Sequence, residues 1–568
     1  MKKTVNSKLY ANTVKFLFPV ILIALCFLNV RKGIDVSDSG YGFTNFLLGR
    51  EIDGMWYYST LLSNVLGRVL TFLPYGSTLL GINLYLALVK AMMVFWIYNY
   101  LTGKALMNRE AVFLGLLMAV SLCWAPNLCF YHYLSYYSLA AMVIFMDKAI
   151  RKADNRYFFV AGIIAGLGVF ARFPNICNVA LIAALWWYGI ITHSKLSSIL
   201  RSTFRCILGF LTAILLGVVF IWINGGTIKA YVTGILDLFA MTDEASSYGI
   251  KATLVNLVNS YTCVFYWLIP LLALFLLLLG LGFTEGYVKR FSKPFAVLGV
   301  LLVYAFWFIR GLFVYDFASY ESIYLFGVVI LSLFVLLLCC VIFCRRFTAE
   351  ERFLCTAALI IQFVTPMGSN NSLYAVLNNL FIVAPVVFYM TVRLYKYRRL
   401  RVLQVGLISV FSLYLIHSLI FGASFTFRDS KPYREVSDNE VLKGMKTNEI
   451  NAVFFEDLGE ISKDYRFERS LVLTFGDMPG IVGYMGYQPA LSTTWPTLSS
   501  FSEDKFSRDM DLLQKRMDTD YRDVVVFTDV HYYLEGRKQD ILKKFLEDNH
   551  FYVLYDNGDL KIWIMEDR

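Results

Sequence analysis

The sequence is short of charge, and that shortage excludes an ordinary soluble protein. Asp, Glu, Lys and Arg make up 17% of the 568 residues, against roughly 25% in globular proteins. Hydrophobic residues reach 58%, more than a chain of this length can bury in one aqueous core. The bilayer must act as the solvent for most of the chain, so we expect a polytopic α-helical membrane protein.

Other absences exclude further kinds of site and architecture. No cysteine follows Cys355, and none of the ten forms a pair with metal-ligand spacing, which favours buried apolar thiols over a metal centre. The C-terminal region has no Gly-rich phosphate loop, and the chain has no internal repeat. The first apolar run lacks a small-residue cleavage site, so it is predicted to be an uncleaved anchor.

Apolar runs long enough to cross a bilayer need roughly 17–25 residues. The sequence predicts about thirteen membrane helices, near residues 13–30, 77–101, 111–131, 133–146, 157–171, 175–192, 206–224, 254–282, 294–309, 322–343, 353–367, 375–392 and 402–424. The aromatic share of 17% is typical of a chain whose many helix ends sit at lipid headgroups.

The positions of the basic residues predict which loops lie on the cytoplasmic side of the membrane. They lie in small clusters between the apolar runs, so the formal charge of +10 does not indicate nucleic-acid binding. These clusters occupy every second loop, from Lys2 and Lys3 at the N-terminus to Arg398 and Arg399 before the last helix. The positive-inside rule places such loops in the cytoplasm. An odd number of helices then puts the chain after the last one outside.

Two domains are expected. Residues 1–424 form the transmembrane domain, with a long, acidic first outer loop at 31–76 and a second long outer loop at 225–253. Amphipathic stretches of the first loop, such as 56–62, predict helices that lie in the membrane interface. Residues 425–568 form a small extracytoplasmic α/β domain.

The pattern of this C-terminal domain alternates strands with helices. It predicts strands at 470–475 and 523–528, a helix near 535–549, and a hairpin with strands 551–555 and 560–564. The hairpin turn is Asp-Asn-Gly-Asp, a sequence that favours tight turns. A layered α/β fold follows from this order.

Two carboxylates in the first outer loop are the strongest catalytic candidates. Asp35 and Asp38 lie a few residues beyond the first helix, at the predicted water–lipid boundary. A carboxylate in this place is suited to act as a general base for an acceptor hydroxyl or to hold a divalent cation. The alternative is that both are ordinary outer-loop charges or turn formers.

Three cations are candidates for binding phosphate. Lys90 stands midway along the second apolar run, where a charge needs a cavity or a partner. Arg172 is the sole charge of a short outer turn, beside the helix-breaking Pro174. Arg310 has less context. The alternatives are a structural ion pair or a snorkelling side chain for Lys90, and a lipid-headgroup anchor for both arginines.

Polar turns supply candidate sugar-binding groups. Residues 127–137 and 365–374 combine amides, hydroxyls and aromatic rings, which suit sugar hydroxyls and ring faces but also an interfacial belt. His132 and Asn370 belong to these turns, and Asn175 lies beside Arg172. A histidine such as His132 is more often a satisfied polar residue than a catalyst.

The overall arrangement resembles the GT-C superfamily of membrane glycosyltransferases, in particular the lipid A aminoarabinose transferase and protein O-mannosyltransferase group. The resemblance consists of an N-in first helix, an acidic first outer loop, about thirteen spans and an outer α/β domain. The family's acid followed by an aromatic residue is matched by Asp38-Ser39-Gly40-Tyr41, with Asp35 just upstream. Residues 476–489, continuing through Trp495, are similar to the outer domains of such enzymes.

This resemblance implies an inverting glycosyltransferase with a polyprenyl-phosphate sugar donor. Asp38 or Asp35 deprotonates the acceptor hydroxyl, and Tyr41 belongs to the same motif. Arg172, with Lys90, Arg310 or a cation, stabilises the departing phosphate. No cofactor is expected apart from a possible divalent cation, whose site is unknown. The expected partners are the donor, a lipid, glycan or protein acceptor, and the bilayer of the cytoplasmic (inner) membrane.

Three alternatives stay open at this stage. In an envelope assembly protein without catalysis, the outer domain would be a docking module and the first-loop acids would be incidental. A polysaccharide polymerase or ligase differs from the proposed enzyme in using a lipid-diphosphate donor. A flippase or transporter of lipid-linked glycan precursors normally has repeated halves and broken helices at the midplane. The chain has no repeat and places its polar material at the outer face, which favours an enzyme.

Overall fold

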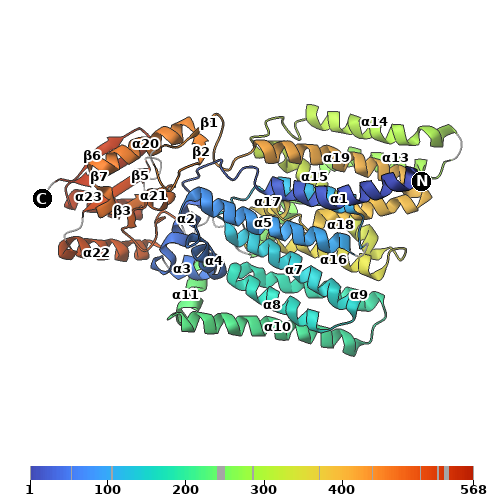
Figure 1. Cartoon of the computed structure of the whole chain (residues 1–568), viewed down its shortest axis with the longest axis horizontal. Coiled ribbons are helices and arrows are strands. Elements are labelled where there is room, and N and C mark those ends of the chain that lie inside the picture. The colour runs from blue at the N-terminus through green and yellow to red at the C-terminus, as the bar shows by residue number, and fades with distance from the viewer. Residues whose placement is uncertain are drawn as a thin grey trace.

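The computed structural model describes the following parts of the chain: residues 2–52, 54–103, 106–239, 250–284, 287–369, 371–437, 439–498, 501–520, 523–529 and 536–566. Helices dominate the first three quarters, and a mixed α/β region forms the rest (Figure 1). The N-terminus and the α/β region lie at opposite ends of the molecule.

Every apolar run singled out in the sequence is helical over most of its length. The helices of this part are α1 (Lys2–Cys26), α5 (Leu79–Thr102), α6 (Arg109–Leu122), α7 (Phe130–Lys152), α8 (Arg156–Ala171), η3 (Phe173–Leu181), α9 (Ile182–Ile191), α10 (Leu196–Ile223), α11 (Ile228–Phe239), α12 (Ile250–Thr262), α13 (Phe265–Leu281), α14 (Tyr287–Ile309), η4 (Tyr320–Ser322), α15 (Tyr324–Phe343), α16 (Ala349–Val364), α17 (Ser372–Asn378), α18 (Val383–Arg393) and α19 (Arg401–Ser424).

Length and composition test which of these can cross a bilayer. Within the described residues, six helices are long and apolar enough, or up to eight if each of two bent pairs counts as one span. The bent pairs are α12–α13, at 54°, and α17–α18, at 72°. The chain is therefore a multi-pass membrane protein, and the expected thirteen crossings stay a prediction.

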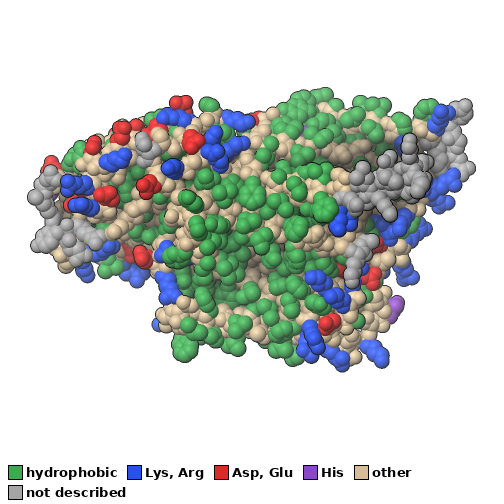
Figure 2. Space-filling view, in the orientation of Figure 1, with side chains coloured by type: hydrophobic (Ala, Val, Ile, Leu, Met, Phe, Trp, Pro, Cys, Tyr) green, Lys and Arg blue, Asp and Glu red, His purple; other side chains and the backbone are tan. Residues whose placement is uncertain are grey.

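The surface agrees with this assignment. Helix α10 exposes Leu211, Leu215 and Trp222, which in water would be an unfavourable apolar patch. Figure 2 shows hydrophobic side chains over the middle of the molecule and Lys and Arg gathered at its right-hand end. Charges of both signs cover the α/β region on the left. An apolar belt between charged ends is the surface that a bilayer requires.

The first outer loop is largely helical. Its elements are α2 (Asp38–Leu48), η1 (Gly49–Glu51), α3 (Gly54–Ser59) and α4 (Leu61–Thr71). They lie between the helical bundle and the α/β region (Figure 1). The second expected outer loop, 225–253, contains α11 and the start of α12, and residues 240–249 fall outside the described part.

The C-terminal region contains the expected α/β layers. Its elements are β1 (Tyr433–Glu435), β2 (Lys446–Asn448), α20 (Glu449–Asp464), η7 (Phe467–Arg469), β3 (Leu471–Phe475), α21 (Gly480–Met485), β4 (Gln488–Pro489), α22 (Glu503–Asp520), β5 (Val524–Asp529), α23 (Arg537–Asp548), β6 (Phe551–Asp556) and β7 (Leu560–Met565). The five-stranded sheet has the order β4-β3-β5-β7-β6, in which β3 pairs in parallel with β4 and β5 and the other pairs are antiparallel.

Neighbouring residues of the strands contribute to hydrophobic cores on opposite faces of this sheet. Leu471 and Leu473 of β3 pack in one cluster with side chains of α22 and α23, whereas Val472 packs in the other with Val525 of β5. Neighbouring strand residues point to opposite faces. The strands of this region predicted from the sequence, including the final hairpin, are thereby confirmed.

Backbone hydrogen bonds join the first loop to the α/β region. The Gly33 amide donates to the Lys446 carbonyl, and the Gly480 amide donates to the Val36 carbonyl, at 2.8 and 2.7 Å. At this junction α2 and α21 cross so closely that a Cβ on Gly480 would lie 2.5 Å from the Cα of Gly40. The loop and the α/β region therefore form one continuous structure.

Gly480→Ala is expected to loosen this junction. The added methyl group meets backbone, which cannot rotate away, so overpacking should destabilise the fold by about 1–3 kcal/mol. Thermal unfolding of the detergent-purified protein measures the change. Gly459→Ala is the matched control, because nothing lies within 4 Å of a Cβ at that position in α20. Equal melting temperatures for the two variants would contradict the close crossing.

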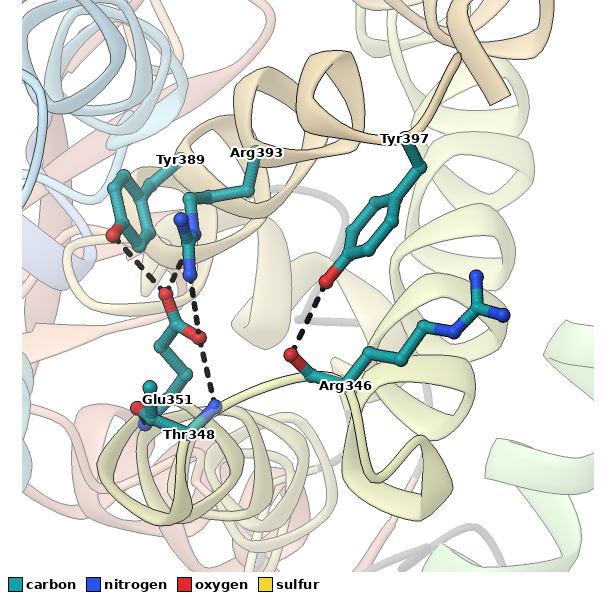
Figure 3. Close-up of polar contacts among 6 residues, drawn as sticks. All are labelled: Arg346, Thr348, Glu351, Tyr389, Arg393 and Tyr397. Carbon is teal, nitrogen blue, oxygen red and sulfur yellow. Dashed lines mark hydrogen bonds and ion pairs between the residues drawn. The ribbon is translucent and has the colours of Figure 1, made fainter. Parts of the chain in front are cut away.

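The carboxylate of Glu351 ties the start of α16 to the end of α18 (Figure 3). Glu351 completes a capping box with Thr348 at the start of α16. Its carboxylate pairs with the Arg393 guanidinium at 2.7 Å and accepts from the Tyr389 hydroxyl at 3.2 Å. Glu351 thus connects a helix start to the end of another helix.

Glu351→Gln should lower the thermal stability of the protein. The change removes the ion pair and weakens the cap, and we expect a loss of about 2–3 kcal/mol because the pair is largely buried. The midpoint of thermal unfolding in detergent reports it. Glu350→Gln, one position earlier, removes the same charge outside this cap and should have a smaller effect. A midpoint unchanged by Glu351→Gln would show that the cluster does not stabilise the bundle.

Candidate functional site

The two first-loop acids have different surroundings. Asp35, between α1 and α2, is only 5% exposed. Its Oδ1 accepts hydrogen bonds from the amide and hydroxyl of Ser37, and its Oδ2 accepts one from the Ser39 amide. Most of the lone pairs of this carboxylate are therefore engaged in holding the start of α2. Asp35 has the geometry of a residue that shapes the loop.

Asp38 is more accessible. It is the first residue of α2, where a negative charge is favoured by the helix dipole. Its side chain is 42% exposed and pairs with the Arg428 guanidinium at 3.4 Å. Burial raises the pKa of Asp38, Arg428 lowers it, and the carboxylates of Asp35 and Asp477 raise it further. A carboxyl with a raised pKa is better suited to accept a proton.

A cavity of about 160 Å³ lies beneath this loop. Its lining comes from the end of α1, from α5, from the turn between α6 and α7, from residues 425–427 and from α21. Asp35, Ser39 and Lys90 all belong to the lining. The structure thus brings together a first-loop acid and the lysine of the second apolar run, which the sequence singled out separately.

Two lysines line this cavity: Lys32, which is partly buried, and Lys90 inside the bundle. Lys90 is 8% exposed, its Nζ donates to the Cys123 carbonyl at 3.4 Å, and it lies 5.4 Å from the ring centroid of Tyr133. In the described part of the chain, no carboxylate lies within ion-pair distance of it. A buried ammonium with one long hydrogen bond and an aromatic face is incompletely compensated, so an anion entering the cavity would be stabilised.

Arg172 belongs to a different group of residues. Its guanidinium donates to the Gly368 carbonyl, which joins the short turn of Arg172 to the polar turn 365–374. Asn175 is also here: its amide donates to the Ser135 hydroxyl and to the Gly168 carbonyl, both at 2.8 Å. His132 lies between the rings of Tyr131 and Tyr136. None of these three candidates is among the described residues that line the Lys90 cavity.

The remaining candidates are dispersed. Arg310 lies at the exposed end of α14, with its guanidinium 6.0 Å from the ring centroid of Tyr266, and it is not a lining residue of the cavity. Asn370 lies outside the described residues. Of the three cations predicted to bind phosphate, only Lys90 is among the described residues that line the cavity.

Tyr41 links the first loop to the α/β region. Its hydroxyl lies 3.2 Å from that of Thr493, and its ring meets those of Trp56 and Trp495 edge to face. The aromatic residue of the first-loop motif therefore contacts the C-terminal segment that the sequence resemblance singled out.

Sequence reasoning missed two charged residues of this site. Arg428 follows α19 directly and was indistinguishable from the charges of a solvated domain, and Asp477 lies in the turn before α21. The proximity of Arg428 to the start of α2 depends on the chain folding back across 391 residues, and Asp477 comes from still further along the sequence. The one available signal was the position of Arg428 at the boundary between a membrane helix and a polar region.

A metal site is not evident in the described residues. No group of three or more His, Cys, Asp or Glu side chains gathers there in a way that could hold an ion. Asp35 is committed to Ser37 and Ser39, and Asp38 faces an arginine. The expected divalent cation therefore has no assigned ligand and stays a prediction. Measuring sugar transfer with and without a chelator tests it.

No family model and no curated protein matches the chain. Among solved structures, it is similar to an Archaeoglobus fulgidus oligosaccharyltransferase in complex with zinc and sulfate, with 12% identity, a TM-score of 0.46, and coverage of 96% of this chain and 72% of that one. ArnT from Cupriavidus metallidurans, bound to undecaprenyl phosphate, is 11% identical, with a TM-score of 0.43 and coverage of 96% and 97%.

A third similar structure is the archaeal oligosaccharyltransferase AglB from Archaeoglobus fulgidus, in complex with an inhibitory peptide and a dolichol-phosphate. It is 11% identical, with a TM-score of 0.41 and coverage of 97% of this chain and 74% of that one. All three are GT-C glycosyltransferases, the group that the sequence resembles. At these TM-scores, the likenesses assign neither a residue role nor a substrate to this chain.

Proposed function

We propose that the chain is a glycosyltransferase that moves a sugar from a polyprenyl-phosphate donor to an acceptor hydroxyl at the outer face of the cytoplasmic membrane. The observation that carries the proposal is the Lys90 cavity. It combines a buried cation that lacks an ion-pair partner in the described chain with the first-loop acid Asp35, and Asp38 follows three residues later on the same loop. A lipid-linked phosphate sugar has the matching chemistry: an apolar tail, an anionic phosphate and a polar sugar.

In this proposal the donor phosphate lies near Lys90, with its polyprenyl chain among the membrane helices. The ammonium stabilises the charge that develops on the phosphate oxygen as the bond to the sugar breaks. Because Lys90 is held in a low-dielectric cavity, this interaction is stronger than it would be in water.

Asp38 is the proposed base. Its carboxylate takes the proton of the acceptor hydroxyl, the acceptor oxygen forms a bond to the anomeric carbon, and the bond from that carbon to the phosphate oxygen breaks. The electron pair leaves with the polyprenyl phosphate. Attack opposite the leaving group inverts the anomeric centre. Asp35 is assigned a positioning role, because its oxygens are engaged by Ser37 and Ser39.

The test uses purified protein in sealed vesicles with radiolabelled polyprenyl-monophosphate sugars and an extract of envelope lipids and glycans as acceptor. We expect the label to move from the donor to the acceptor fraction. A label that only crosses the bilayer indicates a flippase, and transfer restricted to diphosphate donors indicates a polymerase or ligase. Either result, or no turnover of any donor, would overturn the proposed donor class.

A further inference from the structure

Arg428 contacts the first loop although the two are 391 residues apart in the sequence. It follows α19 and donates to the Ser37 hydroxyl while pairing with Asp38 at 3.4 Å. Its guanidinium lies 5.5 Å from the ring centroid of Phe427, a cavity-lining residue. Two of these contacts are with residues at the start of α2.

The backbone at Arg428 is fixed by the next residue. Asp429 accepts hydrogen bonds from the Ile34 amide at 3.2 Å, the Thr447 hydroxyl at 2.6 Å and the Asn448 amide at 3.0 Å. These partners belong to the first loop, β2 and the start of α20. Arg428 is thereby held at a set position relative to both the loop and the α/β region, so its contact with Asp38 does not depend on a free linker.

The charges around Asp38 give this contact a chemical role. Asp35 precedes α2 on the same loop, and Asp477 comes from the turn before α21. Both carboxylates raise the pKa of Asp38. From the segment after α19, Arg428 is the opposite charge. Without it, burial and the two neighbouring carboxylates would all favour the protonated form of Asp38, which cannot act as a base.

We propose that Arg428 is the positioning residue of the catalytic base: it holds the Asp38 carboxylate in place and keeps it ionised. This inference rests on the proposed glycosyl transfer. It also means that the base is competent only when the segment after α19 is seated on the first loop. The α/β region then contributes to the chemistry through its anchor at Asp429.

The test compares Arg428→Gln and Arg428→Lys with the wild type over pH 5–9, measuring kcat and KM for a radiolabelled polyprenyl-phosphate sugar. Removing the opposite charge raises the pKa of Asp38, so the acid limb of kcat should move about one unit to higher pH in Arg428→Gln. It should stay near the wild-type position in Arg428→Lys. Arg31→Gln is the control, because Arg31 also joins the loop to the α/β region through an exposed pair with Glu435.

A second readout does not depend on transfer. Carbodiimides modify protonated carboxyl groups, so the pH dependence of Asp38 labelling, mapped by mass spectrometry, reports its ionisation directly. We expect the labelling midpoint of Arg428→Gln to lie above that of the wild type. Unchanged labelling and an unchanged acid limb, or a raised donor KM with an unmoved limb, would overturn the inference. If the labelling midpoint shifts in Arg428→Gln but the wild-type protein transfers no sugar, Arg428 does control the ionisation of Asp38 and the proposed glycosyl transfer is rejected.

Discussion

Asp38→Asn should reduce sugar transfer by roughly 10²–10⁴-fold, the usual contribution of a general base. The amide has nearly the same shape and keeps its place at the start of α2, but it cannot accept the proton of the acceptor hydroxyl. The loss should appear in kcat, with little change in the KM for the donor, because Asp38 is not among the residues that line the Lys90 cavity. Initial rates with a radiolabelled donor measure it.

Asp35→Asn is the informative comparison. An amide at this position keeps an oxygen that can accept from Ser37, but one of the two acceptor sites becomes a donor facing the Ser39 amide. We expect a lower melting temperature and a smaller loss of kcat than for Asp38→Asn. Full transfer by both variants would reject the first loop as the source of the base. A larger loss at Asp35 than at Asp38, without destabilisation, would exchange their roles.

Lys90→Met should weaken donor use by about 10–100-fold, which corresponds to the 1.5–3 kcal/mol of one charged hydrogen bond. Methionine fills a similar volume with an apolar chain, so the bundle should stay folded or become slightly more stable, because a buried charge has been removed. The change should raise the KM for the donor and the Kd for undecaprenyl phosphate, used as a probe without its sugar.

The control for this variant is Lys148→Met. Lys148 lies on α7 against the rings of Trp96, Tyr100 and Phe145 and is not a lining residue of the cavity. It should bind and use the donor as the wild type does. If both lysine variants bind undecaprenyl phosphate equally well, Lys90 does not bind the donor. Its role is then structural, which was an alternative interpretation of the sequence.

The helical part of the fold was predictable because the bilayer leaves few options for a backbone. An apolar run in lipid must satisfy its hydrogen bonds internally, so each run became a helix. The bends between α12 and α13 and between α17 and α18 could not be predicted, because hydropathy alone treats each of these runs as continuous. The β-strands were predictable from alternation, and the final hairpin from its turn.

The site was only partly predictable. Asp35 and Lys90 were separately conspicuous, one for its place after a helix and the other for its charge within an apolar run, and they line the same cavity. Arg172 was equally conspicuous, yet its guanidinium bonds to Gly368 and it is not a lining residue. Local sequence indicates that a charge needs a partner, but not where the chain folds to provide one.

Arg428 illustrates the opposite case. Nothing in its neighbourhood in the sequence distinguishes it from the solvated charges that follow, and its role depends on contacts with Ser37 and Asp38 that only the fold creates. The same holds for the Gly40–Gly480 crossing, in which two unremarkable glycines permit the first loop and the α/β region to meet.

Photo-crosslinking tests the central claim, that the cavity below the first loop receives the donor, most directly. A polyprenyl-phosphate sugar with a photoreactive group on its first isoprene unit would be bound to the wild-type protein in vesicles, illuminated and mapped by mass spectrometry. We expect the label on α5 and on the turn between α6 and α7, competed by undecaprenyl phosphate and reduced in Lys90→Met. Label at the Arg172 turn, or spread over the lipid-facing surface of α10 without competition, would contradict the account.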